Sequence, residues 1–298
     1  MSREIGNGIL SVSCVQFDPI SANTMEDVDR NTDRILEYMD RAAVGNPGTD
    51  IVVFPECCFQ GCAAVNWIKV ALTLDSEPVR RVREKCKDLQ MWGIFNPWIK
   101  PDDGTFIENL AIVVDDEGEI VGKYVKMNPA VPFEQTKPGR ELTVIEGPKG
   151  AKMAILICSD SQYPELWREA GYKGANVVFH ISHWLCPFEE QWEITNRAGA
   201  LYGGYPVIAV NSFGTDEGFS SFGNSMVVAA NGHVNYLAPQ MPCIFSTTVA
   251  PAAASAARIN GMVKAPWSSY HRGAACPDQN GIGLDYSDYA IYRDHIQR

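Results

Sequence analysis

The chain has 298 residues, of which 46% are hydrophobic and 20% charged, a composition typical of a globular protein with one large or two smaller domains. Its formal net charge of −11 argues against nucleic acid and anionic membranes as partners, because both attract basic surfaces. No apolar run reaches the roughly 18 residues of a membrane span, and the N-terminus lacks the pattern of a signal peptide.

Short β-branched runs alternate with helical patterns along the chain, and this alternation predicts an α/β protein. The predicted strands span residues 10–17, 50–55, 92–97, 110–114, 120–126, 152–158, 176–182, 207–211, 225–229 and 234–238. The predicted helices span residues 25–43, 76–89, 164–173 and 188–201. Two hairpins are expected, one through Asp115–Gly118 and one through the Asn231-Gly232 turn. The acidic cluster Asp115–Glu119 is then a solvated hairpin tip.

No linker or repeat divides the sequence. The only shift in composition is the Ala-rich stretch at residues 249–257. We therefore expect a core domain over residues 1–258 and a tail over residues 259–298 that wraps the surface or a partner subunit.

The nine cysteines are odd in number and irregularly spaced, which favours reduced thiols in a cytoplasmic protein over a disulfide framework. No CxxC pair is present. His180 and His183 are three residues apart at a predicted strand, so they point to opposite faces. Because a zinc site needs three or four converging ligands, we expect no metal site.

Two charged residues follow or end predicted strands. Glu56 comes directly after the apolar run IVVFP, which would deliver it to the carboxyl edge of a sheet, where α/β proteins place ligands. Lys126 ends the strand in GKYVKMNP, with Tyr124 on the same face. Taken alone, each residue is equally consistent with an ordinary solvated surface position.

A third residue, Cys158, ends the apolar strand of KMAILICSDSQYPELW (residues 152–167). The turn SDS follows, and Pro164 is suited to the first position of a helix. This strand, turn and helix resembles a nucleophile elbow, in which the helix N-terminus would lower the pKa of the thiol. The alternative is a buried core cysteine, since free cysteines are among the most buried residues.

Together, FPE, GKYVK and ICSDSQYPE resemble the Glu-Lys-Cys triad of the nitrilase superfamily, in the family's order. Residues 146–179, together with QWEITNRAGA, SSFGNSMVVAANG and SSYHRG, are most similar to the aliphatic amidase and formamidase branch. The resemblance covers roughly residues 10–275. It implies a four-layer α-β-β-α sandwich, a homo-oligomer of two or more subunits, and no cofactor or metal.

The resemblance also implies a role for each matching residue. Glu56 is the general base, Lys126 stabilises the oxyanion and Cys158 is the nucleophile; Glu134 matches a second glutamate of the branch. Such a set hydrolyses small aliphatic amides, such as formamide or acetamide, through a cysteine thioester. The backbone N–H of Ser159 is expected to be a second oxyanion donor. Glu134 is expected to orient the substrate NH2 group.

The chain departs from its relatives around the pocket. Cys57 replaces an aromatic residue, His183 a glycine and Leu201 a tryptophan, whereas Trp184 matches an aromatic residue near the substrate. We expect Trp184, His183, Ser159 and Cys57 to contact substrate, although His183 and Leu201 could equally be packing changes. Asp160 is expected to stabilise the turn after the nucleophile and, like His180, to take no catalytic part.

Two alternative functions remain open. One is hydrolysis of a nitrile or an N-carbamoyl amide by the same triad. YPE after Cys158 favours the amide branch, and a carbamoylase would need a cation for its substrate carboxylate, for which Arg197 is the candidate. The other is a catalytically silent homologue that serves as a scaffold, which the intact set of Glu56, Lys126, Glu134 and Cys158 disfavours.

Overall fold

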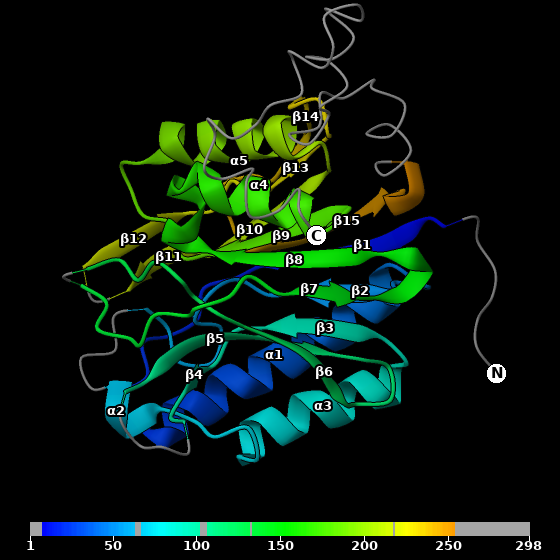
Figure 1. Ribbon diagram of the computed structural model, residues 1–298. Coiled ribbons are helices and arrows are strands. Elements are labelled where there is room, and N and C mark those ends of the chain that lie inside the picture. Colours follow the sequence, from blue (N-terminus) through cyan, green and yellow to red (C-terminus); the bar gives the residue numbers. More distant parts are fainter. Residues whose placement is uncertain (1–7, 63–66, 102–105, 132, 217, 254–298) are drawn as a thin grey trace, which may run out of the picture.

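A computed structural model describes residues 8–62, 67–101, 106–131, 133–216 and 218–253. Two β-sheets stack face to face, and helices cover the outer face of each, so the described chain forms four layers, α-β-β-α (Figure 1). This arrangement confirms the predicted fold class. The tail predicted for residues 259–298 lies outside the described residues.

The first sheet has seven strands in the order β15-β1-β2-β3-β5-β4, with β6 paired to β5. β1, β2 and β3 are parallel neighbours. β15 runs antiparallel to β1, and β5 runs antiparallel to β3. The strands are β1 Leu10–Gln16, β2 Ile51–Val53, β3 Trp92–Phe95, β4 Trp98–Ile99, β5 Glu108–Val114, β6 Ile120–Val125 and β15 Cys243–Val249.

The second sheet has six strands in the order β14-β13-β10-β9-β8-β7, with β8, β9 and β10 parallel. A separate two-stranded sheet pairs β11 with β12. The strands are β7 Val144–Glu146, β8 Lys152–Ile157, β9 Val177–Ser182, β10 Val207–Asn211, β11 Phe213–Asp216, β12 Phe219–Phe222, β13 Met226–Val228 and β14 Val234–Leu237.

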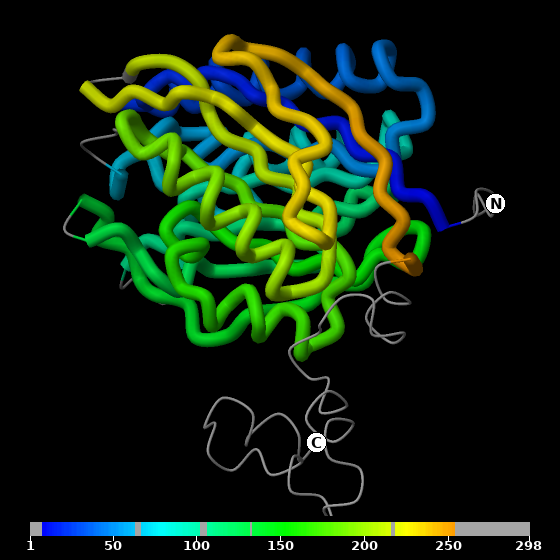
Figure 2. Tube along the Cα trace, turned by 90° about the horizontal axis from the view of Figure 1, so that it is seen from above, coloured from blue at the N-terminus to red at the C-terminus, as the bar shows by residue number. Residues whose placement is uncertain are grey.

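Helices α1 and α3 pack beside each other on the first sheet, and α4 and α5 do the same on the second (Figures 1 and 2). The helices are α1 Met25–Gly45, α2 Trp67–Val70, α3 Glu77–Leu89, α4 Pro164–Tyr172 and α5 Glu189–Gly203, with short 3-10 helices η1 Pro148–Gly150 and η2 Cys158–Gln162. Among the described residues no helix is both long and apolar enough to cross a membrane.

α1 shows how the sequence forms the outer layers. Thr24 caps its N-terminus in a reciprocal hydrogen-bond pair with Asp27, which satisfies backbone N–H groups that the helix itself leaves free. Val28, Ile35 and Met39 recur at helical spacing and are fully buried against the first sheet. The opposite face carries charged residues, so the helix lies flat on the sheet with one face in solvent.

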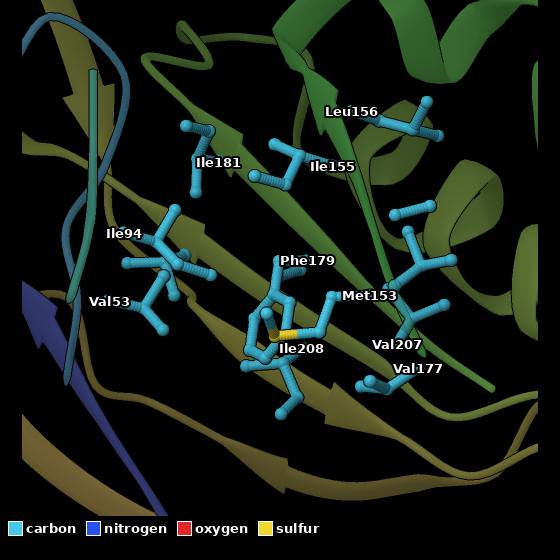
Figure 3. Close-up of a cluster of buried hydrophobic side chains, with 14 of the residues drawn as sticks. Val53, Ile94, Met153, Ile155, Leu156, Val177, Phe179, Ile181, Val207 and Ile208 are labelled. Carbon is cyan, nitrogen blue, oxygen red and sulfur yellow. The ribbon is translucent and has the colours of Figure 1, made fainter. Parts of the chain in front are cut away.

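Side chains from both sheets form the core between them. In Figure 3, Val53 and Ile94 of the first sheet lie across from Ile181 and Ile208 of the second, with Phe179 beside them, and all five belong to one buried cluster. Each is fully buried. Burial of each such side chain stabilises the folded state by about 1.5–3 kcal/mol. The packed layer therefore fixes the distance between the two sheets.

Both predicted hairpins are confirmed. β5 pairs antiparallel with β6, and Asp115 and Glu119 close the tip between them. β13 pairs antiparallel with β14 around Asn231 and Gly232. All ten predicted strands and all four predicted helices are present with ends shifted by at most a few residues. Five strands were not predicted, namely β4, β7, β11, β12 and β15.

Candidate active site

Glu56, Lys126 and Cys158 each follow closely on a strand of the central layers, after β2, β6 and β8 respectively. The structure brings Glu56 and Lys126 together, with Lys126 Nζ donating to Glu56 Oε1 at 2.9 Å. Both side chains are almost wholly buried. Cys158 is held near them, because Ser159 next to it donates through Oγ to the carbonyl oxygen of Asn128, two residues after Lys126, at 2.6 Å.

Glu134 joins the same site, because Lys126 Nζ also donates to Glu134 Oε2 at 2.6 Å. The lysine therefore lies between two buried carboxylates. Burial alone would lower the pKa of Lys126, but the charges of Glu56 and Glu134 and the hydrogen bond to Glu134 raise it well above its usual range. The group is thus held as an ammonium ion at neutral pH, the charge state that the predicted oxyanion-stabilising role requires.

The carboxylate of Glu56 receives three hydrogen bonds. Oε1 accepts from Lys126 Nζ at 2.9 Å and from Asn109 Nδ2 at 2.7 Å, while Oε2 accepts from the backbone N–H of His183 at 3.0 Å. Burial would raise the pKa of Glu56, but Lys126, Asn109 and the His183 N–H outweigh it and lower the pKa. Glu56 is therefore ionised in the resting protein.

Glu134 is more fully bonded than Glu56. Its Oε1 accepts from Asn109 Nδ2 at 2.9 Å and Thr136 Oγ1 at 2.9 Å, and its Oε2 accepts from Lys126 Nζ at 2.6 Å and Ala130 N at 3.1 Å. Four donors match the roughly four lone-pair sites of a carboxylate. A substrate NH2 group would have to displace or share one of these donors to be oriented by Glu134.

Cys158 lies on a sharp turn between β8 and η2, with a φ of 48°, a left-handed conformation that residues other than glycine seldom adopt. Such a conformation costs about 1–3 kcal/mol and persists only where the surroundings enforce it. Asp160 enforces it here: Oδ2 accepts from Ile157 N at 3.1 Å and from Tyr124 Oη at 2.7 Å. This agrees with the stabilising role expected for Asp160.

The same turn is attached to the loop after Lys126. Asp160 Oδ1 accepts from Asn128 N at 2.8 Å, and Ser159 Oγ donates to the Asn128 carbonyl at 2.6 Å. These bonds join the second sheet to the first at the point where their functional residues emerge. They fix the position of Cys158 relative to the Lys126 ammonium group.

The free thiol of Cys158 is not ionised in advance. Burial and the charge of Glu56 raise its pKa well above the usual range, and the Lys126 ammonium only partly offsets them. Attack by this sulfur therefore requires a base that removes the thiol proton. Glu56, ionised and with one hydrogen bond on Oε2, has the chemistry of that base.

His180 lies beneath the turn in the core. Its Nε2 donates to the Cys158 carbonyl oxygen at 3.1 Å, and its Nδ1 is 2.8 Å from Asn196 Oδ1. Burial lowers the pKa of His180 to about 4. The Trp184 ring packs edge-on against His180, and its Nε1 donates to the Phe188 carbonyl oxygen at 2.9 Å.

The other predicted contact residues are placed as follows. His183 reaches Glu56 through its backbone N–H, while its Nδ1 is 2.8 Å from Ser221 Oγ. Cys57 is buried, and its Sγ accepts a hydrogen bond from Trp98 Nε1 at 2.9 Å. Leu201 is 46% exposed on α5, so it faces solvent in the described chain.

A cavity of about 100 Å3 adjoins the site. His183 forms part of its wall, together with Asp18, Pro19, Ile20, Phe213, Gly214 and Thr215. A larger cavity of about 480 Å3 lies elsewhere, along β6 and the segment at residues 137–143. Of these two cavities, the smaller is lined by His183, whose backbone N–H bonds Glu56, and neither is lined by Glu56, Lys126, Glu134 or Cys158.

Asn109, Asn96 and Thr136 were not predicted from the sequence. Asn109 starts the otherwise apolar run NLAIVV and is fully buried. A buried polar residue must find hydrogen-bond partners, so an asparagine beside an apolar strand is the signal that could have identified it. Among the described residues, no group of three or more His, Cys, Asp or Glu side chains is arranged to hold a metal ion.

Comparison with known proteins identifies the family of the chain. The carbon-nitrogen hydrolase family profile matches residues 11–258. A formamidase of Photorhabdus laumondii is 36% identical over 229 residues, covering 76% of this chain and 68% of its own. A formamidase of Bacillus cereus is 35% identical over 221 residues, covering 73% and 67% respectively.

Solved structures share the fold. Saccharomyces cerevisiae Nit3, a nitrilase superfamily member, superposes with a TM-score of 0.76 at 21% identity, covering 85% of this chain and 94% of its own. A carbon-nitrogen hydrolase from Helicobacter pylori G27 gives a TM-score of 0.77 at 20% identity, covering 95% and 99%. With the family profile spanning most of the sequence, the chain belongs to the carbon-nitrogen hydrolase family.

Proposed function

We propose that this protein hydrolyses a small aliphatic amide, of the size of formamide or acetamide, to a carboxylic acid and ammonia. The observation that carries the proposal is the buried ammonium of Lys126 held between Glu56 and Glu134, beside a cysteine on a strained turn. The formamidase relatives support a short acyl group.

In the first half-reaction the Cys158 sulfur attacks the amide carbonyl while its proton passes to Glu56 Oε2. The carbonyl oxygen becomes an oxyanion that Lys126 Nζ and the Ser159 N–H stabilise, and the loss of one such donor typically costs about 3–4 kcal/mol. The tetrahedral intermediate then breaks its C–N bond. Glu56 returns the proton to the leaving nitrogen, so ammonia departs and a thioester remains.

The second half-reaction consumes one water molecule. Glu56 accepts a proton from water as the water oxygen attacks the thioester carbonyl. The C–S bond breaks, the carboxylic acid leaves and the proton returns to the Cys158 sulfur. Glu134, with four hydrogen bonds of its own, keeps Lys126 charged and fixed throughout both halves.

The alternatives find less support. Arg197, the candidate cation for an N-carbamoyl substrate, has a half-exposed side chain on α5, where it pairs with Glu193 at 2.9 Å and donates to the Gly232 carbonyl oxygen. A silent scaffold would have no need to bury two carboxylates and an ammonium group, because such burial carries a desolvation cost. Nitrile hydrolysis would use the same groups, so an assay with a nitrile beside the amides distinguishes the two reactions.

We also propose a homo-oligomer in a reducing, cytoplasmic compartment. The eight cysteines that the structure describes are all unpaired. α5 exposes Ile194 and Leu201, seven residues apart on one face, and Tyr202 beside them, at 62%, 46% and 53%. An apolar face of this kind is suited to contact with another subunit. Light scattering should give a mass of at least two chains.

The test is ammonia release from formamide, acetamide, propionamide, acetonitrile and an N-carbamoyl amino acid, with the wild type and Cys158→Ala. We expect turnover of a short amide by the wild type and none by the variant. With hydroxylamine added, the thioester should be trapped as a hydroxamate. Turnover of only the nitrile or the carbamoyl compound would replace the proposed substrate, and no turnover by a folded, reduced wild type would refute the function.

A further inference from the structure

Asn109 bridges the two carboxylates of the site. It lies at the start of β5, is fully buried, and uses the two hydrogens of one Nδ2 atom to donate to Glu56 Oε1 at 2.7 Å and to Glu134 Oε1 at 2.9 Å. The two glutamates come from different loops, 78 residues apart in the sequence. Besides Lys126, Asn109 is the described residue that contacts both of them.

The orientation of the Asn109 amide is fixed by its neighbours. Its Oδ1 accepts from Asn96 Nδ2 at 2.9 Å, and Asn96 Oδ1 in turn accepts from the backbone N–H of Cys57 at 2.7 Å. Turning the Asn109 amide over would bring its oxygen against two carboxylate oxygens and its NH2 against the NH2 of Asn96. The chain from Cys57 N–H to the carboxylates therefore has only one satisfied arrangement.

This arrangement makes the two oxygens of Glu56 unequal. Oε1 receives two hydrogen bonds, from Asn109 and Lys126, whereas the described hydrogen bonds give Oε2 only the His183 N–H. All four lone-pair sites of Glu134 are occupied. Together the two carboxylates have about eight lone-pair sites. The described hydrogen bonds occupy all of them except one, and this unoccupied site is on Glu56 Oε2.

We infer that Asn109 is a positioning residue that directs base catalysis to Glu56 Oε2, by holding Oε1 of both carboxylates in one place. This inference rests on the proposed function, because it names the oxygen that takes the thiol proton. Without the bridge Glu56 keeps two donors and Glu134 keeps three. Glu56 is therefore the group whose ionisation and orientation depend more on Asn109.

The test compares Asn109→Leu, which has a similar volume but no donor, with Thr136→Val, which removes a donor from Glu134 alone. Asn109→Leu should lower kcat on the order of 100-fold with little change in KM, since a misplaced base affects the chemical step. The acidic limb of its kcat/KM profile should move to higher pH, because an ionised Glu56 loses a hydrogen bond. Thr136→Val should leave that limb in place.

A purely structural role for Asn109 would reduce the fraction of active enzyme without moving the acidic limb of the kcat/KM profile. Active-site titration of Cys158 measures that fraction, and each rate is divided by it. If Asn109→Leu does not fold, Asn109→Ser serves instead, because one hydroxyl cannot donate to both carboxylates. Coincident limbs in the wild type and the Asn109 variant, or an equal displacement in Thr136→Val, would overturn the inference.

A measurement without substrate separates this inference from the proposed function. The infrared band of protonated Glu56 is identified by its absence in Glu56→Gln, and its pH titration needs no turnover. We expect the band to titrate at higher pH in Asn109→Leu than in the wild type. That result with no amide hydrolysis would refute the function alone; unchanged titration with normal wild-type hydrolysis would refute the role of Asn109 alone.

Discussion

At the scale of single residues, the ionisation of the Cys158 thiol is set by opposing charges. Burial and the carboxylate of Glu56 raise the pKa of the thiol, while the Lys126 ammonium lowers it. Glu56 thus has two effects that act in opposite directions. In the proposed mechanism it promotes attack as a base by taking the proton, whereas its negative charge opposes formation of the thiolate.

Glu56→Gln separates these two effects. Amide turnover should be lost, because the neutral amide cannot accept the thiol proton. The thiolate should nevertheless form at lower pH than in the wild type, because Lys126 remains charged through Glu134 while the negative charge of Glu56 is gone. Iodoacetamide alkylation of Cys158, measured by mass spectrometry across pH, checks this shift. Alkylation that follows the wild-type profile would show that Glu56 does not control the thiol.

At the scale of elements, a glycine sets the distance between α4 and α5. A Cβ atom added at Gly199 of α5 would lie 2.4–2.6 Å from the Trp167 ring of α4, closer than real atoms approach. Trp167 is itself fixed, because its Nε1 donates to the Ser161 carbonyl oxygen at 2.9 Å. The helix pair therefore supports η2, the segment that starts with Cys158.

Gly199→Ala should lower the free energy of unfolding by about 1–3 kcal/mol, because the methyl group forces the two helices apart. Gly45→Ala is the matched control. Gly45 ends α1, and a Cβ atom added there would meet nothing within 4 Å, so alanine should be neutral or slightly stabilising. Urea unfolding of both variants measures the difference. Equal urea midpoints for the two variants would show that α4 and α5 move apart to accommodate the methyl group without loss of stability.

The individual strands also show which elements a local sequence pattern can predict. Strands such as β8 and β9 are largely apolar runs with clear ends, and the pattern predicted them. β4 has two residues, too few for a periodic signal, and β7 has three of which only Ile145 is buried, unlike the fully buried three-residue strands β2 and β13. β15 alternates poorly and exists because it pairs with β1, more than 200 residues away, which local patterns cannot show.

The candidate site likewise contains residues that sequence motifs predict and residues that only the folded chain reveals. Glu56, Lys126 and Cys158 were predicted because each belongs to a short motif with a family resemblance, and Glu134 because the resemblance places a glutamate eight residues after the lysine. Asn109 was missed because its role depends on two loops that meet only in the folded chain. The occupied lone pairs of Glu134 were likewise invisible, since they come from three separate segments.

At the scale of the whole molecule, the neutral imidazole of His180 ties stability to pH. The folded pKa is lowered from 6.5 to about 4, chiefly by burial, so the unfolded chain binds more protons between these values. Stability therefore falls as the pH falls below about 6.5. Linkage gives a loss of about 2 kcal/mol from this group between pH 7 and pH 5, before most carboxylates titrate.

Urea midpoints at pH 7, 6 and 5 check this for the wild type, His180→Gln and the exposed-site control His233→Gln. His180→Gln should lose less stability on acidification than the wild type, whatever its stability at pH 7. His233→Gln should parallel the wild type, because His233 is exposed at a hairpin end. Parallel curves for all three proteins would mean that the buried imidazole does not govern acid sensitivity.

The pairing of β1 with β15 has a consequence for synthesis on the ribosome. Leu10 pairs with Val249 and Gln16 with Cys243, so the first and last described strands lie side by side (Figure 2). At about 5–20 residues per second, the partner of Leu10 is made roughly 10–50 seconds after Leu10 itself. For that interval the nascent chain carries β1 with one edge unpaired, and such edges invite aggregation. The first sheet can therefore be completed only after β15 has been synthesised.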